Sequence, residues 1–514
     1  MAATSAAVLV ASSLSSAPAT AGPDVDSSAF RAEVTTEGIT DHLEALQRIA
    51  TANDNTRASG TPGYDASVDY VVDTLTAAGY DPTVQTFEFP FFRENTPATL
   101  SQTSPTPTTY ANPGDFASMT YSASGTVTDK AVVPVDTDAT PNATSTSGCE
   151  ASDFPATVSG NVALMQRGTC TFGVKVANAQ DAGAAAAIVF NRGTGADTGA
   201  IAGTLGTPQA APGIPALGAS FAVGQDLFDS GTRVSITSDT ESEIRDTYNV
   251  IAQTEGGNAR RVIQAGAHLD SVVAGPGIND NGSGSASLLE VAEAMADENP
   301  VNKVRFSWWG AEELNLLGSQ HYVSDLSSKQ LSKIALYLNF DMVGSPNYVR
   351  FVYDGDNSAF PVGPGAAEGP PGSGQIEALF HDYFESQGLA SDETPFSGRS
   401  DYGPFIAEGI PAGGLFTGAE GAKTEAQAAV YGGQAGVAYD HCYHQACDGI
   451  GNVNMDAIGE MSGAIAHAVW VYSQDASSVT GATAGGAAVR GTGTGELRQK
   501  AHDYDAPNHH AARR

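Results

Sequence analysis

The sequence predicts an α/β protein in which a central β-sheet is flanked by helices. Between about residues 244 and 473, apolar runs at residues 262–267 and 334–340 alternate with helical stretches such as residues 285–295. Short apolar runs rich in β-branched and aromatic residues are typical of buried strands, and their alternation with helices indicates crossover connections. Hydrophobic residues make up 41% of the chain, which is enough for a sizeable core.

Two further regions precede this α/β region. Residues 39–49 and 64–75 have helical periodicity, and the Thr-, Ser- and Pro-rich stretch at residues 96–109 has the composition of a loop. Residues 117–239 are rich in small residues and contain a strand–turn–helix–strand pattern at residues 161–190. We therefore expect a small β-rich domain inserted into the larger one.

The two ends of the chain differ in composition from the rest. Residues 1–21 form a short apolar run that ends in small-residue patterns of the kind cleaved by signal peptidase, which predicts a secreted protein. The alternative is a disordered N-terminal tail. Residues 476–514 are rich in Gly, Thr and Ala, and we expect them to be disordered.

The charge balance excludes several classes of partner. The chain carries 58 acidic and 24 basic residues, a formal net charge of −34. Nucleic acids and anionic membranes both require a basic protein surface, so neither is an expected partner. No segment after the N-terminal run has the roughly 20 continuous apolar residues of a transmembrane helix. The acidic surplus suits a secreted protein or one that tolerates high salt.

The four cysteines form two local pairs, Cys149 with Cys170 and Cys442 with Cys447. An even number of cysteines in an exported chain favours disulfide bonds. The alternative is a structural zinc ion held by all four thiolates. The pairs lie far apart in the sequence, however, and neither has the two-residue spacing typical of such sites. We expect two disulfides.

Two adjacent glutamates, Glu312 and Glu313, follow a predicted strand at residues 304–309. Burial of two uncompensated carboxylates side by side is costly, or it forces one of them to bind a proton. A bound metal ion is the simplest compensation. The alternative is an acidic first turn of a helix, where carboxylates interact favourably with the helix dipole.

Other side chains that can bind metal also follow predicted strands or turns. These are His268, Asp270, Asp280, Asp341 and His444. Ligands gather beyond the carboxyl ends of strands in α/β sheets, so we expect these groups to converge. Two histidines with several carboxylates and no cysteine are typical of zinc in an open catalytic site. A pair of zinc ions could activate water, and a spare carboxylate could carry its proton to a leaving amine.

Five motifs occur in the order found in one enzyme family. They are Gly266-Ala-His-Leu-Asp-Ser271, Gly277-Ile-Asn-Asp-Asn-Gly-Ser-Gly284, Trp309-Gly-Ala-Glu-Glu-Leu314, Asn339-Phe-Asp-Met-Val-Gly344 and Cys442-Tyr-His444. They resemble the signatures of the secreted di-zinc aminopeptidases, which include the co-catalytic leucyl aminopeptidases and their aminopeptidase Y-like relatives. The resemblance implies the mixed-sheet fold of that family and hydrolysis of the N-terminal peptide bond.

The resemblance also implies a role for each residue of the site. The zinc ligands would be His268 and Asp341 for one ion, Glu313 and His444 for the other, and Asp280 as the bridge. Glu312 would be the general base and then the general acid, and Tyr443 would stabilise the oxyanion. Asp270 would orient His268, as metal-bound histidines commonly require. The family often has a cis peptide after the bridging aspartate, which here would join Asp280 to Asn281.

Two further segments, Gly398-Arg-Ser-Asp-Tyr-Gly403 and Gly414-Leu-Phe-Thr-Gly418, also resemble the family. By this resemblance the carbonyl of Arg399, with Asp341 and Glu312, would receive the free α-amino group of the substrate. The residues implied for the side-chain pocket are Met342, Gly398, Arg399 and Phe416. Such a pocket implies preference for large apolar N-terminal residues such as Leu. Alternatively, Met342 and Phe416 are ordinary core residues. Some relatives bind calcium, but its ligands have no match here.

The Arg-Gly-x-Cys-x-Phe run at residues 167–172, followed by Lys175 in an Ala-rich helix, resembles the protease-associated (PA) domain. That module is usually non-catalytic. The resemblance implies a PA insert at residues 117–239 between two parts of the peptidase domain, residues 22–116 and 240–475.

The leading hypothesis is therefore an exported, monomeric zinc aminopeptidase that acts on peptide or protein N-termini. A carboxypeptidase or a glutaminyl cyclase on the same fold is an alternative. The first would need basic residues for a C-terminal carboxylate, and the second would use a single zinc ion. A non-catalytic, receptor-like module is a third hypothesis, but such proteins lose metal ligands and the full set occurs here.

Overall fold

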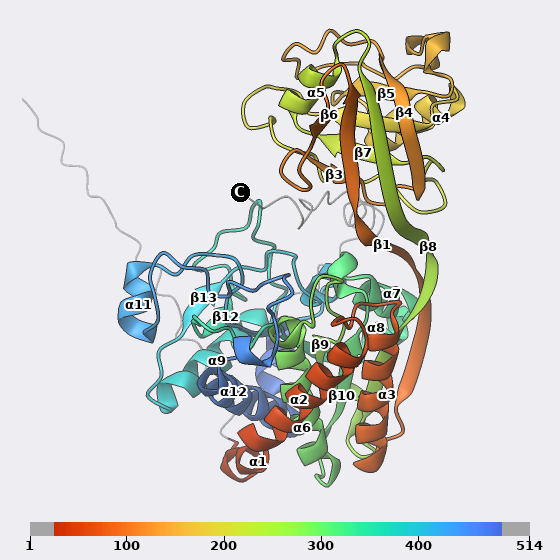
Figure 1. Ribbon diagram of the computed structural model, residues 1–514. Coiled ribbons are helices and arrows are strands. Elements are labelled where there is room, and N and C mark those ends of the chain that lie inside the picture. Colours follow the sequence, from red (N-terminus) through yellow and green to blue (C-terminus); the bar gives the residue numbers. More distant parts are fainter. Residues whose placement is uncertain (1–24, 486–514) are drawn as a thin grey trace, which may run out of the picture. The chain divides into compact units, whose positions relative to one another are not determined.

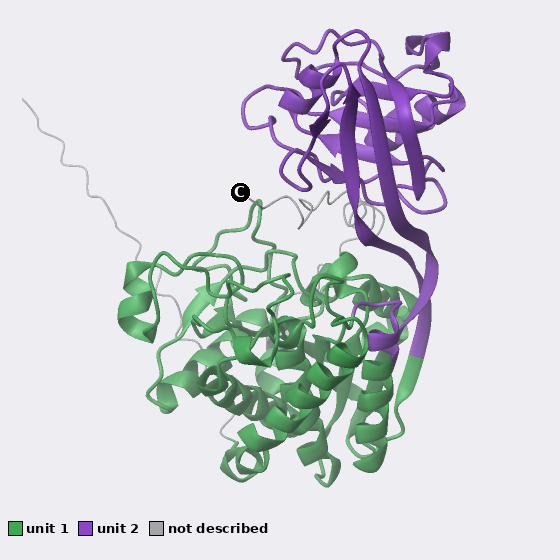
Figure 2. Cartoon of the chain, in the orientation of Figure 1, with its two compact units in different colours: residues 1–57, 66–84, 249–492 green, residues 58–65, 85–248, 493–514 purple. Residues whose placement is uncertain are grey.

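The computed structural model describes residues 25–485, which form two compact units (Figures 1 and 2). Within the described residues, unit 1 comprises residues 25–57, 66–84 and 249–485, and unit 2 comprises residues 58–65 and 85–248. The predicted signal segment at residues 1–21 lies outside the described residues. Two long strands, β1 (Thr83–Ser104) and β8 (Arg233–Gln253), connect the units along the chain.

The sheet of unit 1 has the strand order β13-β12-β14-β11-β9-β10-β8. Its other strands are β9 (Asn258–His268), β10 (Asn302–Trp309), β11 (Ile334–Phe340), β12 (Phe351–Tyr353), β13 (Asp392–Thr394) and β14 (Ala412–Phe416). Strand β9 is parallel to β10 and β11, and β11 is parallel to β14. Strand β8 is antiparallel to β10, and β12 is antiparallel to β14. The predicted mixed sheet is confirmed.

Helices cover both faces of this sheet, as Trp308 and Trp309 at the end of β10 show. Adjacent residues of a strand point to opposite faces. Trp308 Nε1 donates to the Ser285 carbonyl of α6 (Gly284–Ala296) at 3.1 Å. Trp309 Nε1 instead donates to the Tyr337 hydroxyl at 2.8 Å, and its ring packs beside Phe405 of α10 (Tyr402–Ala407). Helix α12 (Met455–Gln474) packs with α6 and with α9 (Ser373–Ser386), and α7 (Leu317–Asp325) packs with α10.

The two helices predicted near the N-terminus are present as α2 (Thr36–Ala52) and α3 (Pro62–Ala77), after a short α1 (Ser28–Glu33). The side chain of Thr35 caps α2 by accepting a hydrogen bond from the Gly38 N–H. Unit 1 also contains α8 (Ser328–Leu331), α11 (Glu425–Tyr431) and the 3₁₀ turn η5 (Ile450–Asn452).

The prediction of a loop at residues 96–109 is wrong, because β1 continues through Ser104 and pairs with the antiparallel strand β2 (Thr108–Thr109). Side chains at Ala98, Leu100 and Gln102 are buried at alternate positions, as in a strand with one buried face. Pairing of β1 with β2 and β8 supplies backbone hydrogen bonds that local composition does not reveal.

Unit 2 contains a sheet with the strand order β8-β4-β5-β6-β7-β3. Its elements are β3 (Phe116–Ser118), β4 (Gly125–Pro134), η1 (Ala151–Asp153), η2 (Ala156–Val158), β5 (Val162–Gln166), α4 (Phe172–Asp181), β6 (Ala186–Phe190), β7 (Ala216–Ala219) and α5 (Phe221–Leu227). The predicted strand–turn–helix–strand pattern corresponds to β5, α4 and β6. Every residue of β5 and β6 is buried, which explains their small, apolar composition.

Helix α13 (Ser477–Gly485) occupies the start of the segment that the sequence analysis predicted to be disordered. Its Val479 is buried, and the helix contacts α9 and β11, so packing orders residues whose composition does not favour a helix. The rest of that segment lies outside the described residues.

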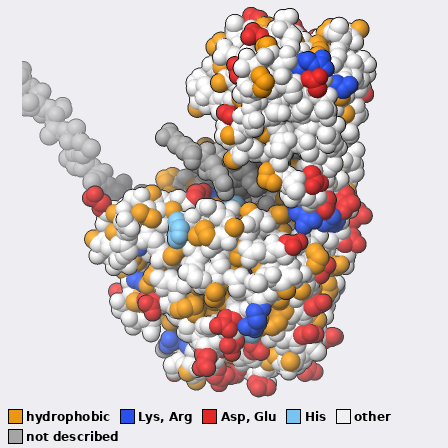
Figure 3. Space-filling view, viewed as in Figure 1, with side chains coloured by type: hydrophobic (Ala, Val, Ile, Leu, Met, Phe, Trp, Pro, Cys, Tyr) orange, Lys and Arg blue, Asp and Glu red, His pale blue; other side chains and the backbone are white. Residues whose placement is uncertain are grey.

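Acidic side chains are spread over the visible surface in Figure 3, where Lys and Arg are fewer. Among the described residues, no helix combines the length and apolar character needed to cross a bilayer.

Candidate metal centre

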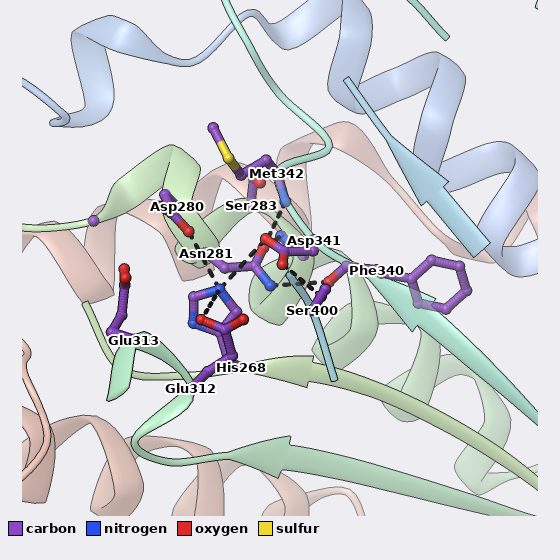
Figure 4. Close-up of polar contacts among 12 residues, drawn as sticks. His268, Asp280, Asn281, Ser283, Glu312, Glu313, Phe340, Asp341, Met342 and Ser400 are labelled. Carbon is purple, nitrogen blue, oxygen red and sulfur yellow. Dashed lines mark hydrogen bonds and ion pairs between the residues drawn. The ribbon is translucent and has the colours of Figure 1, made fainter. Parts of the chain in front are cut away.

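The predicted site residues come together within unit 1, beyond the carboxyl ends of β9, β10 and β11 (Figure 4). The pair Glu312–Glu313 lies in a short 3₁₀ turn, η4 (Glu312–Leu314), directly after β10. Left-handed backbone at Ala311, Asn315 and Leu316 makes this turn tight. Figure 4 shows the Glu312 carboxylate beside the His268 ring and the Glu313 carboxylate apart from it.

His268 ends β9 and is almost completely buried, with 1% of its surface exposed. Its Nε2 faces three carboxylates, at 3.2 Å from Asp280 Oδ1, 3.4 Å from Asp341 Oδ1 and 3.8 Å from Glu312 Oε2. We call His268, Asp341 and Glu312 the His268 side of the site.

His444 lies opposite, on the loop that contains the second disulfide. Its Nε2 is 2.8 Å from Glu313 Oε2 and 3.2 Å from Asp280 Oδ2. We call His444, Glu313 and Asp280 the His444 side. Because Asp280 directs Oδ1 to His268 and Oδ2 to His444, its single carboxylate lies between the two sides.

Asp280 lies in an irregular helical turn, η3 (Ile278–Ser283), that leads into α6. The expected cis peptide joins Asp280 to Asn281. Asn281 links this turn to the end of β11: its Nδ2 donates to the Phe340 carbonyl at 2.9 Å, and its Oδ1 accepts from the Met342 N–H at 3.1 Å (Figure 4). The side chain of Asn281 therefore fixes Asp280 relative to Asp341.

The carboxylates and imidazoles strongly perturb one another. Burial and neighbouring acids raise the pKa of Glu313 to about 7 and hold that of Glu312 well above its ordinary value. Burial alone would lower the pKa of His444, but Glu313 and Asp280 outweigh it and raise the pKa to about 11. The pKa of His268 is likewise raised, by Glu312 and Asp341 against burial.

These residues fit a pair of metal ions. His268, Glu312 and Asp341 offer ligand atoms within 4.8 Å of one another, and so do Asp280, Glu313 and His444. Four carboxylates face only two imidazoles, so bound cations would balance the excess of buried negative charge. Glu313 Oε1 is buried and has no hydrogen-bond partner in the described part of the chain, which leaves it available as a ligand. A nitrogen and oxygen donor set without cysteine suits zinc.

Asp270 contacts both His268 and Glu312. The His268 Nδ1 lies 3.1 Å from the Asp270 backbone carbonyl and 3.7 Å from its carboxylate Oδ1. That Oδ1 accepts a hydrogen bond from the Glu312 N–H at 3.1 Å. The carbonyl of Asp270 thus contacts the imidazole, while its carboxylate holds the turn that carries Glu312.

Both predicted disulfides are present, Cys149–Cys170 in unit 2 and Cys442–Cys447 in unit 1, with S–S distances of 2.04 and 2.09 Å. The alternative of one zinc ion held by four thiolates is therefore excluded. Within the Cys442–Cys447 loop, the Tyr443 ring stacks on His444 with centroids 3.8 Å apart.

The residues predicted to bind substrate are only partly brought together. The Arg399 Nη2 donates to the Tyr443 hydroxyl at 3.1 Å, and the Arg399 guanidinium also pairs with Glu420 at 2.8 Å. Gly398 is exposed and has a left-handed φ of +82°. Met342 is buried beside Asn281, and Phe416 is half-buried and stacks on Phe351.

Sequence reasoning missed several buried polar residues around the site. Ser400 donates to Asp341 Oδ2 at 2.6 Å and accepts from Asn339 Nδ2 at 2.8 Å. Burial and nearby acids, opposed by His268, raise the pKa of the neighbouring Asp401 to about 7. Ser400 and Asp401 lie in the Gly398–Gly403 motif, and the resemblance of this motif to the family could have identified them as site residues. Asp440 and Asp448, beside the second disulfide, are also buried and had no signal in the sequence.

Comparison with known proteins agrees with this geometry. The profile of Peptidase family M28 matches residues 249–469, and that of the PA domain matches residues 127–227. An aminopeptidase from Pseudomonas aeruginosa is 50% identical over 432 residues, which cover 82% of this chain and 78% of that relative. The chain belongs to peptidase family M28.

Another relative and two solved structures are similar along most of the chain. A probable leucine aminopeptidase 2 from Aspergillus oryzae is 42% identical over 458 residues, 88% of this chain and 87% of the relative. An aminopeptidase from Aneurinibacillus sp. strain AM-1 has a TM-score of 0.59 at 23% identity, covering 87% of this chain and 95% of that one. A zinc aminopeptidase from Bacillus subtilis has a TM-score of 0.58 at 23% identity, covering 86% and 96%. At 23% identity, these two structures show that this M28 peptidase has the same fold as they do.

Proposed function

We propose that this M28 peptidase is a secreted di-zinc aminopeptidase that releases N-terminal residues from peptides and prefers large apolar residues such as Leu. One observation carries the proposal: the two oxygens of Asp280 are each 3.2 Å from a different histidine, His268 and His444. That arrangement suits a carboxylate shared by two ions. The relatives named aminopeptidase and leucine aminopeptidase 2, and the neighbour named a zinc aminopeptidase, support the assignment.

His268 and Asp341 would hold one zinc ion, Glu313 and His444 the other, and Asp280 both. The bound pair would polarise the scissile carbonyl and lower the pKa of water.

Glu312 is the residue that moves the proton. Its carboxylate is 3.8 Å from His268 Nε2, farther than those of Asp280 and Asp341. Of the three, Glu312 is therefore the carboxylate best placed to act as a base and not as a metal ligand. Glu312 takes a proton from the attacking water and delivers it to the departing amine nitrogen. The Asp270 carboxylate keeps Glu312 in place through the Glu312 N–H.

Tyr443 donates a hydrogen bond to the oxyanion as the carbonyl carbon becomes tetrahedral. Because the Tyr443 oxygen accepts from Arg399, its own proton remains available for the substrate. The substrate amino group is received by Asp341, Glu312 and the carbonyl of Arg399. Met342, Gly398, Arg399 and Phe416 form the pocket for the N-terminal side chain.

Export is supported by the two disulfides, since such bonds persist in oxidising compartments. The predicted signal at residues 1–21 agrees with it.

The proposal is tested with purified protein supplied with zinc. We expect two zinc ions per chain by elemental analysis, and release of p-nitroaniline from leucyl-p-nitroanilide but not from its N-acetylated form. Cyclisation of N-terminal glutamine with one zinc ion per chain would indicate a glutaminyl cyclase instead. Cleavage of the blocked substrate, or release of C-terminal residues, would contradict an aminopeptidase.

A further inference from the structure

A buried network of carboxyl and amide groups contacts the turn that carries Asp280. Its members are Asn279, Asp440, Asp448 and Asn452, each no more than 5% exposed. The resemblance implied no role for any of them. They come from the turn that carries Asp280 and from the segment around the Cys442–Cys447 disulfide.

Asp448 binds the main chain of the Asp280 turn with both carboxylate oxygens. Its Oδ1 accepts from the Asn279 N–H at 2.9 Å, and its Oδ2 accepts from the Asp280 N–H at 3.0 Å. The main chain of Asp280 is not helical, with φ −106° and ψ 94°, so the turn does not provide these donors with regular helical partners. Asp448 therefore supplies acceptors where the irregular backbone cannot.

Asp440 connects the same turn to the loop that carries His444. Its Oδ2 accepts from Asn279 Nδ2 at 2.7 Å, and its Oδ1 accepts from the Cys442 N–H at 2.8 Å. Asn452 joins the two carboxylates, because its Nδ2 donates to Asp440 at 2.9 Å and to Asp448 at 3.1 Å. The network thus fixes the Asp280 turn relative to the loop that presents His444.

We propose that Asp448, with Asp440, is a positioning residue that sets the zinc affinity of the His444 side of the site. This inference rests on the proposed zinc site. Asp280 Oδ2 and His444 Nε2 are 3.2 Å apart, and they come from segments far apart in the sequence. A displacement of the network moves two ligands of the His444 side, Asp280 and His444. On the His268 side it moves only Asp280, because His268 and Asp341 keep their places at the ends of paired strands. Groups that orient metal ligands commonly contribute about 10–100-fold to metal affinity.

The test is zinc binding by metal-stripped protein, titrated against a chromophoric chelator, for Asp448→Asn and Asp448→Ala. The asparagine keeps one acceptor oxygen but places an amide NH₂ against a backbone N–H. We expect one zinc equivalent to bind about tenfold more weakly in Asp448→Asn and weaker still in Asp448→Ala. The other equivalent should stay within about threefold of the unmodified protein. Cobalt substitution should show the absorption bands of one site changed and those of the other retained.

Asp354→Asn is the matched control. Asp354 is also a fully buried aspartate that accepts backbone N–H groups, from Ser358 at 3.0 Å and Phe360 at 2.7 Å. Its substitution should lower the melting temperature of the metal-free protein and leave both zinc affinities unchanged. A purely structural role for Asp448 predicts the same behaviour for Asp448→Asn.

Unchanged binding of both zinc equivalents in folded Asp448→Asn would overturn the proposal, and so would equal weakening of both. If neither Asp448 variant folds, Asp440→Asn is subject to the same two criteria. Zinc titration needs no substrate, so the two proposals fail separately. A protein that binds two zinc ions but releases no amino acid contradicts the proposed function and leaves this inference standing.

Discussion

The two sides of the metal centre are held in place by different means. His268 ends β9 and Asp341 directly follows β11, and these strands are paired in parallel with Asn339 opposite Gly266. The backbone ladder of the sheet therefore fixes the His268 side. His444 lies on a disulfide-closed loop, with a left-handed φ of +56° and a side chain that is 16% exposed against 1% for His268. Side chains and a covalent bond position the His444 side, which should make it the more easily perturbed of the two.

The largest effect should come from the two adjacent glutamates, which belong to different sides. Glu312→Gln removes the proton carrier, and we expect kcat to fall by about 10²–10⁴-fold while both zinc ions stay bound. Glu313→Gln should instead lower the affinity for one zinc ion. Activity and zinc content measured on the same samples distinguish the two results. Loss of zinc from Glu312→Gln, with full occupancy in Glu313→Gln, would reverse the assignment.

Acid should release both zinc ions, because the pKa of each metal-free histidine is raised and protons compete with zinc for both. The ion of the His444 side should leave first, because His444 lies on a loop and is the more exposed of the two histidines. The pKa of metal-free His444 is raised to about 11, so at neutral pH zinc must displace a proton from this imidazole. The zinc affinity of the His444 side therefore falls about tenfold for each unit by which the pH decreases. Below pH 7 the carboxyl of Glu313, with a pKa of about 7, adds a second proton to be displaced.

Zinc per chain after equilibration with a chelator at pH 8, 7, 6 and 5 should fall from two to one and then lower. Loss of both zinc ions at the same pH would contradict the expected difference between the two sides. Full occupancy and activity well below pH 5 would contradict the histidine ligands themselves.

A smaller effect should follow from removal of the disulfide beside His444. The double substitution Cys442→Ser and Cys447→Ser frees the loop, and we expect zinc affinity on the His444 side to fall severalfold while Asp440 still holds the Cys442 N–H. The matched control is Cys149→Ser with Cys170→Ser in unit 2, which should leave zinc binding unchanged. Equal zinc retention in both double variants would show that side-chain hydrogen bonds alone position His444.

The same contrast explains what the sequence could predict. His268, Asp341 and the glutamate pair follow apolar strands, and the ends of parallel strands converge, so the sequence pattern locates the His268 side. His444 was a candidate ligand from its residue type, but its place in the site and the role of Tyr443 came from the family resemblance, because nothing local indicates where a loop lies. Asp440 and Asp448 were not predicted, since aspartates in a polar loop are usually exposed and only the tertiary structure buries them.

The fold, like the site, could be predicted where the sequence has a strong local pattern. Strands with strong apolar patterns, such as β9 and β11, were found from sequence. The second half of β1 was not found, because its Thr, Ser and Pro residues favour turns and its pairing partners β2 and β8 lie elsewhere in the chain.

The position of Trp308 and Trp309 on opposite faces of β10 has a spectroscopic consequence. The chain has three tryptophans, and all three, including Trp470, belong to unit 1. Indole fluorescence therefore reports on the unit that carries the metal centre, and the PA-containing unit contributes no indole signal. A thermal melt followed by tryptophan emission will measure the unfolding of the zinc-binding unit alone, even where unit 2 unfolds in a separate transition.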